Sequence, residues 1–297
     1  MGFAAVLMWA LLALLTAWSG KVPPFQLAAM TFAVGTVIGL VSLRLRHVDA
    51  RLFRQPPGVW ITGVGGLFGY HALYFAALRH APPAEASLIA YLWPLLIVLG
   101  SALLPGERLR WFHILGALAG LAGAALIVTG GRTLALSPQY VVGYGLAALC
   151  ALTWSTYSLA SRRFSGVPSD IVTGFCAATA VLSLLAHLAF ETTVWPATAG
   201  EWLAVLMLGL MPVGAAFYVW DYGVKHGDIQ VIGAASYAAP LLSTLILVGA
   251  GETQMRWSVV AAALLITAGA CLAALPLFSR LLRRDAGLAA NAKRQPG

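Results

Sequence analysis

Charged side chains are scarce in this sequence. Asp, Glu, Lys and Arg make up 9% of the 297 residues, whereas hydrophobic residues make up 60%. Soluble domains carry about 25% charged residues, so this composition argues against a soluble domain and predicts a protein that crosses a lipid bilayer several times. The net charge of +8 does not indicate a nucleic-acid partner, because the basic residues lie between apolar segments, where they set membrane topology.

Patterns typical of catalysis and metal binding are missing as well. The three cysteines, Cys150, Cys176 and Cys271, are isolated within apolar segments and form no CxxC site. The sequence contains no HExxH or GxSxG pattern. We therefore expect no catalytic residue, no metal and no cofactor. An intramembrane enzyme is kept only as a distant alternative.

The two halves of the chain share a pattern of residues. Because an internal repeat dictates architecture, the chain is expected to consist of two related halves, residues 1–133 and 134–284. The matching residues lie 146 positions apart, or 145 for the Gly-Glu pair and the first tryptophan: Tyr91 and Tyr237, Pro94 and Pro240, Trp111 and Trp257, Gly106-Glu107 and Gly251-Glu252, and Trp9 and Trp154.

Ten apolar segments approach the roughly 20 residues that a membrane-spanning helix needs. They are residues 3–18, 25–43, 58–78, 84–104, 111–129, 141–161, 170–190, 202–224, 229–249 and 257–278. Each half then holds five helices, an odd number, so the second half starts on the opposite face of the membrane. The predicted fold is an all-α polytopic membrane protein in which ten transmembrane helices form two inverted five-helix repeats around a central cavity. Residues 285–297 are expected to be a disordered cytoplasmic tail.

Lys and Arg are distributed unequally between the two sides of this topology. Of the 18 such residues, only Lys21, Arg79, Arg132 and Arg256 fall on the side opposite the termini. Cytoplasmic loops of membrane proteins carry the excess of Lys and Arg, so both termini are predicted to be cytoplasmic.

The fourth and ninth segments, each centred on a proline and closed by Gly106-Glu107 or Gly251-Glu252, resemble those of the drug/metabolite transporter superfamily. The chain is most similar to its EamA-type exporters, in particular bacterial aromatic amino-acid exporters. The resemblance implies a basket-like bundle in the bacterial inner membrane, with the fifth and tenth helices at its periphery. It implies alternating-access export of a small molecule, namely an aromatic or other neutral amino acid.

The driving force of such an exporter stays open. The first and sixth segments contain no acidic residue, whereas the resemblance implies that small multidrug relatives depend on a carboxylate in the first helix. Facilitated transport is therefore favoured, and a proton-coupled drug or metabolite exporter is the alternative, with His71 as the candidate proton carrier.

Two helix faces related by the repeat carry the first candidates for the cavity. They are His71, Tyr74 and Phe75 in the third segment and Phe217, Trp220 and Asp221 in the eighth. Ionisable groups inside a span are costly and face a cavity or a partner, which for Asp221 is Lys225, four residues later. This possible ion pair is expected near the cytoplasmic end, and His71 deeper in the membrane. Packing alone remains an alternative role for these residues.

Further cavity candidates are aromatic. Trp154 and Tyr157 share a face of the sixth segment, and Tyr91 and Tyr237 precede the repeat-matched prolines by one turn. Most tryptophans in membrane proteins belong to interface belts, but rings at repeat-matched positions within a span are expected to line the cavity and to stack on the substrate.

Pro94 and Pro240 are the candidate hinges. Each removes a backbone hydrogen bond within its helix and bends it, although a static kink is the alternative interpretation. Pro212 has Gly66 at the equivalent position, which predicts that the Pro212 kink is not shared by the first half.

Gly116, Gly120 and Gly123 form a face of small residues in the fifth segment. Such faces allow close helix contacts. We expect this face to pack within the chain rather than in a dimer, and so predict a monomer.

Overall fold

The computed structural model describes residues 2–133 and 136–275. All regular secondary structure in these two stretches is helical. Seven helices are long and apolar enough to cross a membrane, and two shorter apolar helices cover Gly2–Trp18 and Trp257–Ala273. The chain is thus an all-helical, multi-pass membrane protein. The predicted end of the tenth helix at residue 278 and the predicted tail 285–297 lie outside the described residues.

The helices follow the predicted segments in chain order. The α-helices are α1 (Gly2–Ala10), α2 (Leu12–Trp18), α3 (Pro24–Leu45), α4 (Pro57–Val64), α5 (Tyr70–His80), α6 (Pro83–Ala90), α7 (Trp93–Gly100), α8 (Trp111–Thr129), α9 (Val141–Arg163), α10 (Val172–Phe190), α11 (Ala199–Leu210), α12 (Ala216–His226), α13 (Ile229–Ala235), α14 (Ala238–Gly249) and α15 (Trp257–Ala273). Short 3₁₀ turns are η1 (Ala50–Phe53), η3 (Ser101–Leu103), η4 (Pro138–Tyr140) and η5 (Ser169–Ile171), and π-helical turns are η2 (Gly65–Gly69) and η6 (Met211–Ala215).

Several predicted helices are interrupted. The first breaks at Leu11, between α1 and α2, where the sequence contains neither proline nor glycine to indicate it. The fourth and ninth are interrupted directly before their prolines, between α6 and α7 and between α13 and α14. Each proline therefore lies in the first turn of a new helix, where its missing N–H costs little.

The prediction that the Pro212 kink has no counterpart in the first half is wrong. The π-helical turns η2 and η6 join α4 to α5 and α11 to α12, and they lie 146 positions apart. Pro212 interrupts the α-helical hydrogen bonds in η6. In η2, glycine residues give the backbone the freedom to adopt the same kind of turn. Gly66 also lets a ring approach the backbone, since a Cβ there would lie 2.5 Å from the ring of Tyr157 in α9. π-turns of this kind are frequent at functional sites.

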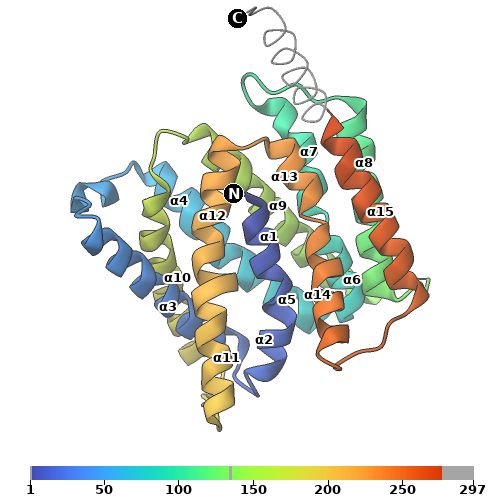
Figure 1. Cartoon of the computed structure of the whole chain (residues 1–297). Helices are drawn as coiled ribbons and strands as arrows, with labels where there is room; N and C mark the ends of the chain where they lie inside the picture. Colours follow the sequence, from blue (N-terminus) through green and yellow to red (C-terminus); the bar gives the residue numbers. More distant parts are fainter. Residues whose placement is uncertain (1, 134–135, 276–297) are drawn as a thin grey trace, which may run out of the picture.

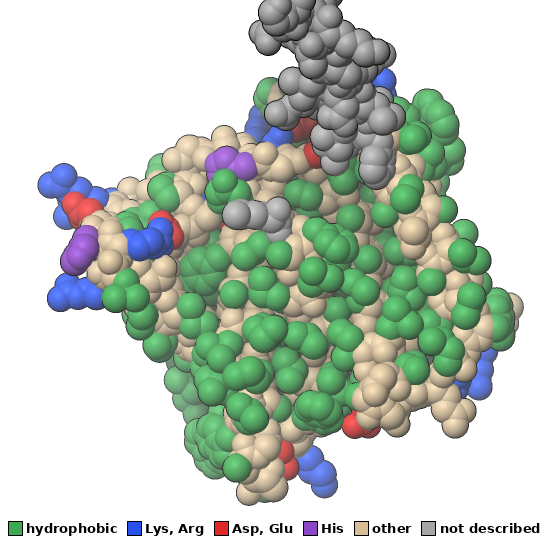
Figure 2. Space-filling model, in the orientation of Figure 1, with side chains coloured by type: hydrophobic (Ala, Val, Ile, Leu, Met, Phe, Trp, Pro, Cys, Tyr) green, Lys and Arg blue, Asp and Glu red, His purple; other side chains and the backbone are tan. Residues whose placement is uncertain are grey.

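The outer surface of the bundle is apolar. Leu103, Leu45 and Ile61 are among its most exposed side chains, at 81%, 75% and 73%. Figure 2 shows hydrophobic side chains over the middle of the visible face, with charged side chains gathered at its margins. Such a surface can face lipid tails, because the backbone N–H and C=O groups of each helix are already hydrogen-bonded within the helix.

Helices from the two halves pack against each other in pairs. α8 packs with α15 at one side of the bundle, and α3 packs with α10 at the other (Figure 1). Between them, α5 contacts α9 and α1 contacts α12. The prediction that the small-residue face packs within the chain is confirmed, because a Cβ on Gly116 would lie 2.5 Å from the Gly269 carbonyl oxygen of α15.

Candidate functional site

Four tryptophans meet where α1, α7, α9 and α12 converge. Trp9, Trp93, Trp154 and Trp220 are mutual neighbours, and the ring centroids of every pair lie between 5.0 and 6.3 Å apart. We call this group the tryptophan cluster. Trp93, Trp154 and Trp220 are buried, whereas Trp9 is partly accessible. Its members come from both halves of the chain.

Phe217 extends the tryptophan cluster toward α3 and α5. Its ring is 5.7 Å from Trp154 and stacks on Phe32 at 5.4 Å, with 12° between the ring planes. His71 lies edge-on to Phe32 at 5.2 Å, and Phe75 follows at 6.0 Å from His71. The structure therefore brings together His71, Phe75 and Phe217, three of the residues expected to line the cavity.

Three polar atoms of this aromatic region have hydrogen-bond partners within the bundle. The indole Nε1 of Trp9 donates to the carbonyl of Pro212 in η6, at 3.1 Å. The indole Nε1 of Trp220 donates to Ser158 Oγ, also at 3.1 Å. His71 Nδ1 lies 2.7 Å from the Leu67 carbonyl oxygen of η2. The remaining surface is aromatic and uncharged, which suits the apolar part of a solute.

A tyrosine pair borders the tryptophan cluster on the side of α5. Tyr70 and Tyr74 stack at 6.1 Å, and the Tyr74 hydroxyl hydrogen-bonds with Ser87 Oγ of α6 at 2.9 Å. Tyr70 also lies 5.4 Å from Trp154. Both tyrosines are partly accessible, whereas Tyr157 and Trp220 are buried. The aromatic region is therefore more open on the α5 side than on the side of Tyr157.

Asp221 and Lys225 form the predicted ion pair. Lys225 Nζ lies 2.6 Å from Asp221 Oδ2, and the two side chains are only 3% and 1% exposed. Lys225 also donates to the Val167 carbonyl at 2.8 Å. Neither carboxylate oxygen of Asp221 accepts a hydrogen bond of good geometry, and the buried hydroxyl of Tyr157 also lacks a partner. Buried polar groups without partners are unusual, and a water molecule is one explanation for them.

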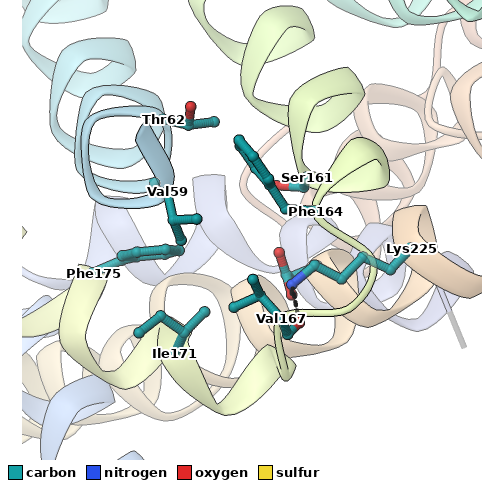
Figure 3. Close-up of a pocket in the computed structure, with 10 residues that line it drawn as sticks. Val59, Thr62, Ser161, Phe164, Val167, Ile171, Phe175 and Lys225 are labelled. Atoms are coloured by element: carbon teal, nitrogen blue, oxygen red, sulfur yellow. Dashed lines mark hydrogen bonds and ion pairs between the residues drawn. The ribbon is translucent and has the colours of Figure 1, made fainter. Parts of the chain in front are cut away.

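A small cavity adjoins this pair. It has a volume of about 10 Å³, which is room for one water molecule. Its walls come from α4, α9, α10, α12 and the η5 region, and include Thr62, Ser161, Phe175, Asp221 and Lys225 (Figure 3). The ion pair thus lies at a junction of elements from the two halves.

Of the two predicted tyrosines that precede the prolines, Tyr237 lies away from the aromatic region, whereas Tyr91 neighbours Tyr70 and Tyr74. Tyr237 is fully buried in a separate core between α8, α14 and α15, where a Cβ on Gly120 would lie 2.4 Å from its ring. Its hydroxyl accepts the backbone N–H of Leu95, at 3.2 Å, directly after Pro94. Tyr91 lies at the interruption between α6 and α7 and is partly accessible. Tyr237 therefore connects to the proline break and not to the tryptophan cluster.

An arginine that the sequence did not single out joins several elements beside the ion pair. Arg162 Nη1 donates to the carbonyls of Val224, Lys225 and Gly227, at 2.7–3.1 Å, and so caps the C-terminal end of α12. Its Nη2 lies 2.6 Å from Glu107 of the first Gly-Glu pair. At the equivalent place in the second half, Glu252 accepts the exposed indole N–H of Trp18.

Trp93, Phe32 and Tyr70 are also part of the aromatic region without having been predicted. Trp93 has Ala239 and Tyr70 has Ala216 at the matching positions of the second half, so the repeat did not select them. Trp9 was identified only as the counterpart of Trp154. Within the described residues, no three His, Cys, Asp or Glu side chains are placed to hold a metal ion.

Comparison with known proteins gives consistent matches along the chain. The EamA-like transporter family model matches residues 1–129 and 141–275. A protein of Ancylobacter novellus named aromatic amino acid exporter YddG is 55% identical over 276 residues, which cover 92% of this chain and 96% of that relative. The pseudopaline exporter CntI of Pseudomonas aeruginosa is 30% identical, over 84% of each chain. A solved crystal structure aligns with a TM-score of 0.88 at 54% identity, over 92% of this chain and 96% of the other.

Proposed function

Because the chain belongs to the EamA-like transporter family, we propose that it exports aromatic and other neutral amino acids from a bacterial cytoplasm by alternating access. Relatives that are named as exporters, of aromatic amino acids in one case and of pseudopaline in another, support a transporter rather than an enzyme. The partners of this protein are then the bilayer of the inner membrane and a small-molecule substrate. We propose that it works as a monomer.

One observation carries this proposal: the tryptophan cluster lies inside the bundle and draws its rings from both halves. An aromatic pair contributes about 0.5–1.5 kcal/mol beyond the burial of its area. When the indoles separate, the free energy of their mutual contacts is lost. A substrate ring that packs against them restores much of that free energy. Because the rings are in mutual contact here, binding requires Trp154 and Trp220 to move apart, and such movement accompanies alternating access.

The proposed architecture is ten spanning helices in two inverted five-helix repeats, residues 1–133 and 134–284. Helix packing supports it. In the proposed repeat, α12 is the counterpart of α5, and α9 contains the counterpart of α1. The contact of α5 with α9 in the bundle then has its counterpart in the contact of α12 with α1. The paired turns η2 and η6 support it as well. Gly106 and Gly251 both have left-handed backbone, with φ of +84° and +78°, which explains why each Gly-Glu pair starts with glycine.

Bending at four matched positions is the proposed movement. The helix interruptions before Pro94 and Pro240 act as one pair, and the turns η2 and η6 act as the other. Hinges absorb large changes of backbone angle over a few residues, and these are the places where the α-helical hydrogen-bond pattern is already broken. A static kink at each proline remains the alternative.

The direction of opening follows from the unequal contacts at the two ends. We assign the Arg162 and Glu107 end to the cytoplasm, in keeping with the excess of Lys and Arg on that side. Four contacts of Arg162 close this end. At the other end, Glu252 accepts the exposed indole N–H of Trp18, and Glu191 joins α3 to α5 through Phe25, Gln26 and Arg79. In this arrangement the opening beside Tyr70 and Tyr74 faces away from the cytoplasm.

Counterflow in proteoliposomes tests the proposed function. Vesicles that contain the purified protein are loaded with unlabelled L-phenylalanine, and the uptake of labelled L-phenylalanine is followed against empty vesicles. A carrier accelerates the labelled uptake when substrate is present inside, because the loaded site returns faster than the empty one. Absence of such acceleration for phenylalanine, tryptophan and leucine alike would contradict export of neutral amino acids.

Proton coupling through His71 is the second candidate. It is favoured by the place of His71 in the aromatic region, where the Leu67 carbonyl engages Nδ1 and leaves Nε2 for a proton or a substrate. A pH gradient across the vesicle membrane would then change the initial rate in the wild type and not in His71→Ala. We expect no effect of the gradient in either protein, as facilitated transport requires.

A further inference from the structure

The buried Asp221–Lys225 pair has few polar groups around it to stabilise its charges. Burial removes the hydration of both charged groups. A buried ion pair therefore often stabilises the fold no more than well-packed apolar side chains of similar size would. Here the Asp221 oxygens lack well-oriented hydrogen bonds, although an ionised carboxylate has about four acceptor positions. Packing alone therefore does not explain why this pair is present inside the membrane.

The position of the pair relative to the aromatic region gives the explanation. Phe217 and Asp221 lie one turn apart on the same face of α12, and a turn of helix spans about 5.4 Å. Tyr157 lies between the two regions, since its ring is 5.2 Å from Trp154 and its hydroxyl neighbours Asp221. Along this face, aromatic surface is followed by a carboxylate and then by an ammonium group.

The same order of groups describes an aromatic amino acid: a ring, one short aliphatic link, and a carboxylate beside an ammonium group. We infer that Asp221 and Lys225 recognise the main-chain zwitterion of the substrate, Asp221 taking the α-ammonium and Lys225 the α-carboxylate, while the ring enters the tryptophan cluster. In the closed arrangement described here the two side chains neutralise each other and the adjoining cavity has room for one water only. Opening of the Arg162 end exposes the pair and lets a substrate replace each partner.

This inference rests on the proposed function and adds a requirement to it, namely that both main-chain charges of the substrate are needed. A charge-assisted hydrogen bond contributes about 1.5–3 kcal/mol, so loss of either substrate charge is expected to weaken binding on the order of tenfold or more. A carrier that recognises only the ring would transport the amino acid, the amine and the acid with similar affinity.

Competition in the counterflow assay tests the requirement. Labelled L-phenylalanine competes with unlabelled L-phenylalanine, with phenethylamine, which lacks the carboxylate, or with 3-phenylpropionate, which lacks the ammonium group. The inference requires both analogues to compete at least roughly tenfold more weakly than phenylalanine. Equal competition by the three compounds overturns the inference and leaves the proposed function intact, whereas no phenylalanine counterflow at all would contradict the proposed function itself.

Substitution then assigns the two charges. Asp221→Asn is expected to reduce the preference for phenylalanine over 3-phenylpropionate while it keeps the preference over phenethylamine. Lys225→Met is expected to give the opposite pattern. Arg46→Met is the matched control, because it breaks the exposed pair with Asp170 at 2.5 Å without touching the cavity, and it should keep both preferences.

The double variant Asp221→Asn with Lys225→Met removes both charges together and leaves no unpaired charge in the membrane. A purely structural pair predicts that this variant keeps the wild-type preferences, and that result would overturn the inference. The inference predicts that both preferences are lost. Should any variant fail to fold, the ranking of the three compounds by the wild-type protein still decides the question.

Discussion

The indole of Trp220 has no exposed surface and lies 5.0 Å from Trp9 and 5.6 Å from Trp93. Its Nε1 is held by Ser158 of α9. A side chain in this position both fills the core and forms the floor of the proposed binding region. At the scale of single residues, stability and transport therefore depend on the same rings, and experiments have to separate the two effects.

Trp220→Ala is expected to lower the free energy of unfolding by about 3–5 kcal/mol, as for other large-to-small core substitutions, and to abolish phenylalanine counterflow. Trp154→Phe retains a ring, so we expect a folded protein with weakened phenylalanine binding. Thermal unfolding in detergent and counterflow measure the two quantities separately. Trp195→Ala is the control, because Trp195 is 62% exposed and stacks only on Trp202. Undiminished counterflow in both cluster variants would rule out the proposed binding region.

The sequence could identify some of these rings and not others. Trp154 and Trp220 were found because their positions have aromatic counterparts in the other half, Trp9 and Tyr74. Trp93 faces the same cluster although its counterpart is Ala239. Tyr237 has an aromatic counterpart in Tyr91, yet it points to Gly120 of α8. A matching position in the proposed repeat therefore does not fix the direction of a side chain, which depends on local breaks that the sequence does not reveal.

At the scale of helices, the π-helical turn η2 depends on close contact with α9. A Cβ on Gly66 would lie 2.5 Å from the Tyr157 ring, whereas a Cβ on Gly65 would meet nothing within 4 Å. Gly66→Ala is therefore expected to cost about 1–3 kcal/mol of stability through overpacking. Gly65→Ala, in the same turn, is expected to be neutral or slightly stabilising, since alanine favours helix. Equal thermal stability of the two variants would contradict this account of the turn.

The break before Pro94 depends on Tyr237. Its hydroxyl accepts the Leu95 N–H, and the phenylalanine variant would leave that N–H unpaired in the interior. Tyr237→Phe is therefore expected to lower stability by about 1–3 kcal/mol, seen as a lower midpoint of thermal unfolding. Tyr91→Phe is the matched control, because no N–H of α14 bonds to Tyr91 among the described residues. A larger loss in Tyr91→Phe than in Tyr237→Phe would refute this role.

Hydrophobic runs predicted where most helices lie, because about 20 apolar residues in a row have few alternatives to a spanning helix. They did not predict the break at Leu11 or the turn η2. Both lie within uniformly apolar sequence, and the contacts that stabilise η2, such as the packing of Tyr157 on Gly66, join segments far apart in the chain. Pro94, Pro212 and Pro240 carried a local signal for a break.

At the scale of the whole molecule, Arg162 and the ion pair concentrate charge at one end of the α9–α12 junction. Arg162, Glu107, Asp221 and Lys225 all lie there, whereas Glu252, which matches Glu107, accepts the exposed indole N–H of Trp18. Positions that match in the proposed repeat thus carry different contacts at the two ends. Such asymmetry lets one conformation be favoured over its mirror state, while the direction of net flux through a facilitated carrier follows the substrate gradient.

Inverted topology makes a prediction that does not depend on substrate. If the second half repeats the first upside down, Lys21 and Gln139 lie on the outer surface of the membrane, and Arg54 and Arg163 lie on the inner one. All four side chains are exposed, so single cysteines there can be labelled after Cys150, Cys176 and Cys271 are replaced by alanine. A maleimide that does not cross membranes is expected to label positions 21 and 139 in intact cells, and positions 54 and 163 only after permeabilisation. Labelling of 21 and 139 from opposite sides would mean that the halves are not inverted, and the proposed chamber between them would then have no basis.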